Sequence, residues 1–289
     1  MRSKLFVPGH RPELFPKALA SAADALSFDL EDAVPAERKA HARASVTACV
    51  RSEAARQSGK VMIVRVNALD SAYFEADIAA LSGLPLDLLN LPKVESADVV
   101  RVAIVQLQRA NADQAIAAPT RLLLNIETPR GLRNAASIAG ADACVAGLQL
   151  GLGDLFEPFG IARTDMANVH AAMFAMRLAA AEAGVFAVDA AFADIADEDG
   201  YRAEAAMAAR LGYVGKTCIH PRQVALANAA FAASADDIEA ARRIVASARD
   251  AAARGAAAFV VDGRMIDPPF LRRAEAIVAA ADRAAGDGA

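Results

Sequence analysis

The chain has 289 residues, of which 55% are hydrophobic and 5% aromatic, enough material for one large domain or two small ones. Its formal net charge of −4 excludes a basic surface for nucleic acid, and no apolar run approaches the roughly 18 residues of a membrane span. The stretch MRSKLFVPGHRPE reaches Pro-Gly too soon for a signal-peptide core, and Cys49, Cys144 and Cys218 share no C-x-x-C spacing, so we interpret the chain as a cytoplasmic protein with reduced thiols.

Short apolar runs that end in polar, Gly or Pro residues recur along the chain and predict eight strands. They cover residues 4–9, 25–32, 60–67, 86–94, 121–127, 143–151, 184–192 and 212–221. Ala-rich, helix-prone stretches separate them, and this alternation favours parallel strands covered by helices. Eight such units predict a (β/α)8 TIM barrel over residues 1–233. An open, doubly wound sheet is the alternative, because short apolar runs do not distinguish the two folds.

The C-terminal part, residues 234–289, exceeds what eight units require. Residues 234–255 predict a helix with Ser234 as its N-cap and Gly255 just after its end. The stretch AAAFVVDGRMIDPPF follows, and a last helix is expected from about Phe270. We interpret this helical extension as a lid or an oligomer contact.

Polar side chains follow most of the predicted strands, at the end of the barrel where such folds carry their chemistry. They are Asp29, Glu31, Asp32, Arg65, Asn67, Lys93, Glu95, Glu127, Asp154, Asp189 and His220. Strand ends also meet solvent, which by itself explains a single polar residue. The whole set is better explained by a site, because Arg65, Glu127 and Asp154 each follow long apolar runs.

The stretch LLLNIETPRG places Glu127 between a buried strand and a helix that begins with Thr128 as N-cap and Pro129 at its first position. A buried carboxylate there needs a cation or hydrogen bonds. The chain has no His/Cys cluster suited to zinc, whereas two carboxylates with water and substrate oxygens suit Mg²⁺. Glu127 and Asp154 end consecutive strands, so we predict that both bind Mg²⁺; an ordinary Gly-Asp turn is the alternative for Asp154.

Several stretches together resemble the citrate lyase beta-subunit-like family, whose relatives include malyl-CoA and citramalyl-CoA lyases within the 2-oxo-acid aldolase and CoA-ester lyase superfamily. The matching stretches are LFVPG, FDLEDAVP, VRVN, LPKVES, IETPRGLRN, GDL, GYVGKTCIHPRQV and DGRMIDPP, in family order from residue 5 to residue 269. The family fold is the (β/α)8 barrel, in agreement with the strand count.

The resemblance implies a role for each matching residue. Glu127 and Asp154 would bind Mg²⁺, with Asp29, Glu31 and Asp32 supporting the waters of the metal. Arg65 would hold the carboxylate or carbonyl end of the substrate; a structural ion pair with Asp29 or Glu31 is the alternative. Phe6, Lys17 and Arg38 would contact coenzyme A, and Ile219 and His220 would line the same cleft. Glu13 stands where some relatives carry a Lys for the CoA phosphates.

The resemblance also implies an activity, a carbon–carbon lyase that cleaves a 3-hydroxyacyl-CoA thioester into an acyl-CoA and a 2-oxo acid. Asp267, before Pro268-Pro269, would be the acid/base, supplied across a subunit boundary of a homo-oligomer, a trimer or a hexamer. The alternative for Asp267 is a turn or helix-start residue. Two other functions stay open: an aldolase for free 4-hydroxy-2-oxo acids, and a citrate-lyase-like subunit that works with an acyl-carrier protein.

Overall fold

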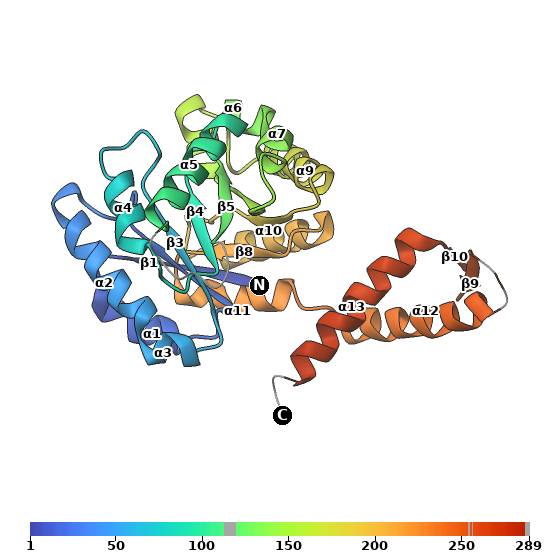
Figure 1. The fold of residues 1–289 in the computed structure, drawn as a ribbon. Coiled ribbons are helices and arrows are strands. Elements are labelled where there is room, and N and C mark those ends of the chain that lie inside the picture. The colour runs from blue at the N-terminus through green and yellow to red at the C-terminus, as the bar shows by residue number, and fades with distance from the viewer. Residues whose placement is uncertain (113–119, 254, 256, 287–289) are drawn as a thin grey trace. The chain divides into compact units, whose positions relative to one another are not determined.

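The computed structural model describes residues 1–112, 120–253, 255 and 257–286. The chain forms two compact units, Met1–Phe231 and Ala232–Ala289, each of which is described by itself (Figure 1). The division lies two residues before the boundary expected from the sequence.

The first unit is built on a closed barrel of eight parallel strands, in which each strand pairs with the next and β8 pairs with β1. This closure confirms the predicted (β/α)8 fold and excludes the open sheet. The strands are β1 Ser3–Pro8, β2 Ala25–Asp29, β3 Val61–Arg65, β4 Leu88–Leu91, β5 Arg121–Ile126, β6 Val145–Leu150, β7 Phe186–Asp189 and β8 Gly215–Cys218.

Helices follow the strands and surround them (Figure 1). The α-helices are α1 Phe15–Leu19, α2 Lys39–Arg51, α3 Glu53–Gln57, α4 Phe74–Leu81, α5 Ala97–Ala110, α6 Pro129–Arg133, α7 Ala135–Ala139, α8 Leu152–Phe156, α9 Met166–Glu182, α10 Glu198–Leu211 and α11 Pro221–Ala230, and the 3₁₀ turns are η1 Pro12–Leu14, η2 Ala36–Arg38 and η3 Glu157–Phe159.

Local signals in the sequence set several of these boundaries. The Thr128 hydroxyl accepts a hydrogen bond from the Gly131 amide at 3.0 Å, and Pro129 is the first residue of α6, as predicted. The predicted run 212–221 is longer than β8, because Gly212 at φ +87° ends α10 and Pro221 begins α11. Glycine suits that left-handed position, since a side chain there is strained.

Two apolar clusters fill the first unit. The large one lies between the barrel and its helices and contains, among others, Leu5 and Val7 of β1 and Leu148 of β6. The small one lies on the inner face of the strands and comprises Ala25, Ile63, Leu88, Leu123 and Ala146. Since side chains alternate along a strand, the two clusters identify which residues point outward and which point into the barrel.

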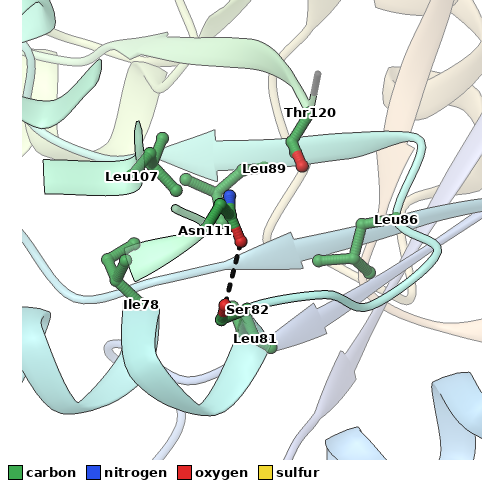
Figure 2. A pocket seen from close by; sticks show the side chains of 8 residues that line it. All are labelled: Ile78, Leu81, Ser82, Leu86, Leu89, Leu107, Asn111 and Thr120. Carbon is green, nitrogen blue, oxygen red and sulfur yellow. Dashed lines mark hydrogen bonds between the residues drawn. The ribbon is translucent and has the colours of Figure 1, made fainter. Parts of the chain in front are cut away.

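A small cavity of about 10 Å³ lies between β4, α4 and α5, as Figure 2 shows. Most of its lining is aliphatic, and its polar side chains include Ser82 and Asn111, which are joined by a hydrogen bond of 3.0 Å. The space accommodates at most a water molecule. We therefore regard it as a packing gap without chemistry.

The second unit contains α12 Ala235–Ala253, a hairpin of β9 Phe259–Val261 and β10 Arg264–Ile266, and α13 Pro268–Gly286. The Ser234 hydroxyl accepts a hydrogen bond from the Asp237 amide at 3.0 Å, which confirms the predicted N-cap. The last helix begins at Pro268, two residues earlier than expected. None of the helices in the described part of the chain has the length and apolar character of a membrane span.

Candidate active site

A cavity of about 240 Å³ opens at the carboxyl ends of the barrel strands. Its lining includes Phe6, Arg65, Glu127, Asp154, Thr217 and Ile219, from β1, β3, β8, α8 and the loops after β5 and β8. Three side chains predicted from separate strand ends, Arg65, Glu127 and Asp154, therefore share one cavity. This is the candidate active site.

Glu127 is buried, with 3% of its surface exposed, and two hydrogen bonds hold its carboxylate in place. Its Oε1 accepts a hydrogen bond from the Lys93 amide at 2.6 Å, and its Oε2 accepts one from Asn125 Nδ2 at 3.3 Å. Lys93 adopts a left-handed conformation, φ +52°, an uncommon one for a residue with a side chain. This strained backbone conformation directs the Lys93 amide toward the Glu127 carboxylate.

The turn after β6 is shaped around the same carboxylate. A Cβ atom on Gly151 would lie 2.5 Å from Glu127 Cβ and 2.6 Å from its Oε2, so only glycine leaves room for the glutamate. Leu152 then begins α8, and Asp154 is exposed in its first turn. The glycine thus has a packing role beside Glu127, and the choice between a metal ligand and an ordinary turn for Asp154 stays a prediction.

Arg65 is paired closely with two carboxylates, Asp29 and Glu31. Its Nε and Nη2 donate to the two oxygens of Asp29, each at 2.7 Å, and its Nη1 lies 2.9 Å from Glu31 Oε2. Burial opposes its charge, but the hydrogen bonds and charge of Asp29 outweigh burial and raise the pKa of Arg65 above its ordinary value. The guanidinium has five N–H groups, so two remain free of these pairs for a ligand. The ion pairs named as the alternative role of Arg65 are present, and its contact with a substrate stays a prediction.

The two cavity carboxylates fit a hard divalent cation. Burial, the charge of Glu31 and the charge of Asp154 together raise the pKa of Glu127 from 4.5 to about 7, against the Lys93 amide and Arg65. A cation between the carboxylates would relieve that repulsion. Across the residues that the structure describes, no three His, Cys, Asp or Glu side chains gather closely enough to hold a metal. The two carboxylates, in a cavity with room for water, suit Mg²⁺, which keeps waters and takes few protein ligands.

The three acidic residues after β2 have different surroundings. Both oxygens of Asp29 are engaged, because the amides of Glu31 and Ala33 also donate to them at 3.0 Å, so Asp29 orients Arg65. Glu31 accepts from Lys93 Nζ at 2.7 Å. Asp32 lines the cavity and is 54% exposed, which places it best among the three to accept from a metal-bound water.

The other residues implied by the resemblance are divided between the cavity and its surroundings. Phe6 lines the cavity, and its ring centre lies 4.8 Å from Arg65 Cζ. Ile219 also lines it, whereas the imidazole Nδ1 of His220 accepts from the Arg222 amide and caps α11. Lys17 and Arg38 are exposed on α1 and η2, outside the cavity lining. Their role toward coenzyme A stays a prediction.

Asp267 belongs to the C-terminal unit, and its role likewise stays a prediction. Its backbone carbonyl accepts from the Leu271 amide at 3.0 Å, so it precedes α13 as a helix-start residue would. Its side-chain Oδ1 is buried and has no hydrogen-bond partner among the described residues.

Sequence reasoning did not identify Asn125, Gln149 and Thr217, all of which line the cavity. Each stands within a strand rather than at its end, in LNI, LQL and KTC. For Asn125 and Gln149, a polar residue between apolar neighbours was a signal for an inward-facing position, whereas Thr217 follows Lys216 and had no such signal. Conversely, Asp189 does not reach the cavity: its carboxylate accepts from Lys216 Nζ at 2.6 Å, in a buried group with Glu204 of α10.

The raised pKa of Glu127 predicts a dependence of stability on pH. The folded, metal-free protein holds this proton up to about pH 7, whereas the unfolded chain releases it near 4.5. The folded state therefore binds more protons in this window, and stability falls as pH rises through it, by about 3 kcal/mol. Urea unfolding of the wild type and of Glu127→Gln across the window measures the effect. If the free energy of unfolding of the two proteins changed with pH in the same way, the raised pKa of Glu127 would be contradicted.

Comparison with known proteins gives consistent matches along the chain. A family model described as HpcH/HpaI aldolase/citrate lyase matches residues 2–221. An L-malyl-CoA/beta-methylmalyl-CoA lyase of Cereibacter sphaeroides is 34% identical over 305 residues, covering 97% of this chain and 94% of that protein. A (3S)-malyl-CoA thioesterase of the same species is 36% identical over 289 residues, covering 100% and 97%. The crystal structure of CitE from Mycobacterium tuberculosis in complex with magnesium, acetoacetate and coenzyme A superposes with a TM-score of 0.74 at 33% identity, covering 96% and 98%.

Proposed function

Because this chain belongs to the HpcH/HpaI aldolase/citrate lyase family, as its motifs indicated, we propose that it is a magnesium-dependent carbon–carbon lyase. Its substrate would be a 3-hydroxyacyl-CoA thioester of the malyl, citramalyl or citryl type, cleaved into an acyl-CoA and a 2-oxo acid. The observation that carries the proposal is the convergence of Glu127, Asp154 and Arg65 on one cavity. Relatives named as malyl-CoA lyases and a neighbour crystallised with magnesium and coenzyme A support it.

The reaction breaks the bond between the carbon that bears the hydroxyl group and the carbon next to the thioester. The hydroxyl group loses its proton and becomes a carbonyl, while the electron pair of the broken bond moves into the thioester as an enolate. A proton then returns to the enolate carbon, which completes the balance. Bound Mg²⁺ would supply Lewis-acid polarisation of the oxygen that becomes a carbonyl.

The residues of the chain would divide the remaining work. Glu127 and Asp154 would hold the metal. The two N–H groups of Arg65 that are not paired with Asp29 or Glu31 would bind the carboxylate of the 2-oxo acid, with Asp29 fixing the plane of the guanidinium. Phe6, Ile219, Lys17 and Arg38 would contact the coenzyme A part of the substrate.

Hydrolysis of the same thioester is a second candidate function. The observation that favours it is the match to (3S)-malyl-CoA thioesterases, at 36% identity over the whole of this chain. The two reactions differ in the bond broken: the lyase leaves the thioester intact in the acyl-CoA product, whereas the thioesterase releases a free thiol and a hydroxy acid.

The test is therefore a product assay with malyl-, citramalyl- and citryl-thioesters in the presence of Mg²⁺. We expect a 2-oxo acid and an acyl-CoA in equal amounts, without free thiol. Free thiol without 2-oxo acid would replace the lyase by a thioesterase. Turnover of free 4-hydroxy-2-oxo acids alone, or only of thioesters on an acyl-carrier protein, would replace it by one of the other two alternatives.

We also propose that the protein works as a cytoplasmic homo-oligomer, a trimer or a hexamer, in which the C-terminal unit closes the cavity of a neighbouring subunit. Asp267 would then be the acid/base that exchanges a proton with the enolate carbon. Its Oδ1 is buried and has no hydrogen-bond partner among the described residues, which supports this role, because a buried carboxylate oxygen without a partner is costly unless it serves the reaction. A lid would keep water from the enolate.

This proposal predicts rescue between two inactive variants. Asp267→Asn lacks the acid/base and Glu127→Gln lacks a metal ligand, so each homo-oligomer should be inactive. In co-expressed mixed oligomers, some cavities would combine an intact metal site with an intact Asp267 and regain partial activity. Activity measured on oligomers purified through two different tags checks this. No rescue in verified mixed oligomers excludes catalysis across subunits, and full activity of Asp267→Asn alone removes Asp267 from the mechanism.

A further inference from the structure

The interior of the barrel contains a layer of four polar side chains directly beneath the candidate active site. They come from alternate strands: Ser27 from β2, Asn90 from β4, Gln149 from β6 and Thr217 from β8. All four are buried, between 0% and 4% exposed. Such layers in (β/α)8 barrels are usually filled by Val, Ile and Leu, so a wholly polar layer is unusual for the fold.

The strand register shows that the four residues lie at one level. Ser27 pairs with Ile63 of β3, which pairs with Leu88 of β4, and Asn90 is two residues further on. The same relation holds around the barrel: following the pairing across two strands and then moving two residues along the chain leads from Asn90 to Gln149. It leads in the same way from Gln149 to Thr217 and from Thr217 back to Ser27. A constant step of two residues for every second strand is what a barrel of eight strands with a shear of about eight requires.

Every member of this layer has a buried polar atom without a hydrogen-bond partner among the described residues. The atoms are Ser27 Oγ, Asn90 Oδ1, Gln149 Oε1 and Thr217 Oγ1. Each such atom destabilises the folded state if nothing bonds to it. Four acceptors at one level are a suitable lining for ordered water, which makes about three hydrogen bonds in a protein interior.

Lys4 contributes a fifth buried group without a partner. It lies on the inner face of β1, because its neighbours Leu5 and Val7 both belong to the outer cluster. By register Lys4 originates one level below the polar layer, with Ile63. Its Nζ nevertheless ends 3.7 Å from the ring centre of Phe6, which lines the cavity one level above the layer. The side chain therefore passes through the level of the four acceptors.

The cost of this lysine is clear from a comparison with Lys216. Both are 0% exposed, but Lys216 Nζ donates to Asp189 and Glu204, whereas Lys4 Nζ has no hydrogen-bond partner among the described residues. Burial, with Arg65 adding to it, lowers the pKa of Lys4 well below that of an exposed lysine, while Asp29 and Glu127 oppose this. Burial of an apolar side chain of the same length would cost less free energy at this position. Stability therefore does not explain Lys4.

We propose that Lys4 is a positioning residue of the active site, kept as a cation by water bound to the polar layer and acting through that water on anions in the cavity. Gln149 and Thr217 belong both to the polar layer and to the cavity lining, so they connect the two spaces. The nature of the anion, an enolate or a 2-oxo acid carboxylate, rests on the proposed function. The action of Lys4 on the metal-binding carboxylates does not.

The proposal predicts opposite changes in metal affinity and turnover for Lys4→Met, which keeps the length of the side chain and removes the charge. Without a positive charge near Glu127, Mg²⁺ should bind up to about tenfold more tightly. Without stabilisation of the developing anion, kcat should fall about tenfold to a hundredfold with little change in KM. Calorimetric titration of the whole protein with Mg²⁺ and steady-state kinetics measure the two effects.

Two further variants make the result specific. Lys4→Gln, which keeps a polar end, should behave like Lys4→Met and serves if the latter does not fold. Ile63→Val changes packing at the level of Lys4 without changing charge, so it should leave Mg²⁺ affinity unaltered. Weaker metal binding together with slower turnover in Lys4→Met would reduce Lys4 to a packing role, and unchanged values of both would remove it from the site.

Two more measurements can overturn the proposal. A crystal structure of the wild type at high resolution should show ordered water between Lys4 Nζ and the four acceptors, and a dry interior contradicts it. Borohydride reduction in the presence of a 2-oxo acid should leave Lys4 unmodified, whereas a mass increase on this residue would make it a nucleophile instead. If the wild type turns over no thioester, the proposed function fails, and the Mg²⁺ titration still decides the role of Lys4.

Discussion

Replacement of Glu127 by Gln or of Asp154 by Asn should lower kcat/KM by about a thousandfold or more and abolish the response of activity to Mg²⁺. Both substitutions keep the shape of the side chain and remove a charged oxygen ligand. Glu127→Gln also removes a buried carboxylate that burial and Glu31 make costly, so its stability above pH 7 should equal or exceed that of the wild type. Kinetics at varied Mg²⁺, calorimetric metal titration and urea unfolding measure the three effects.

Glu157→Gln is the matched control for this experiment. Glu157 is exposed three residues after Asp154, in η3, and does not line the cavity. Its removal changes the net charge near the site by the same amount and should leave activity and metal affinity unaltered. Wild-type turnover with an unchanged metal requirement in Glu127→Gln or Asp154→Asn would show that the carboxylate concerned is not a ligand.

Replacement of Arg65 by Lys should reduce kcat/KM by about a hundredfold to a thousandfold and also destabilise the fold. Lysine keeps the charge but has no planar fork, so it cannot bond both oxygens of Asp29, contact Glu31 and still offer two donors to a substrate. A buried oxygen of Asp29 would lose a partner, at a cost of about 1–3 kcal/mol in the free energy of unfolding. Steady-state kinetics and urea unfolding separate the two losses.

Arg43→Lys provides the control for Arg65. Arg43 of α2 forms a comparable pair with Asp77 of α4, with Nε and Oδ1 2.7 Å apart and side-chain exposures of 15% and 0%. This pair does not line the cavity. Arg43→Lys should therefore lower stability and spare kcat/KM. If Arg65→Lys behaves in the same way, the guanidinium is purely structural and the ion pair with Asp29 is its whole role.

Much of this protein could be predicted from local features of its sequence. Apolar runs separated by helix-prone stretches determined the eight strands and their order, and Thr128-Pro129 and Ser234 marked helix starts. These signals are local, because a cap depends on a few neighbouring residues and a buried strand on one apolar run. The positions of Arg65, Glu127 and Asp154 after such runs were sufficient to place them at one end of the barrel.

Only the tertiary structure decided which polar residues face one another. Strands of a barrel are buried on both faces, so their sequences lack the contrast that would tell the inner face from the outer one. Asp189 therefore looked like a candidate for the site, yet it points outward, where Lys216 bridges its carboxylate to Glu204 of α10. The inward positions of Lys4 and of the polar layer follow from register across all eight strands, a property of the closed sheet that no single strand contains. The left-handed backbone of Lys93 likewise arises where β4 and β5 meet, because its amide is bonded to a carboxylate 34 residues away.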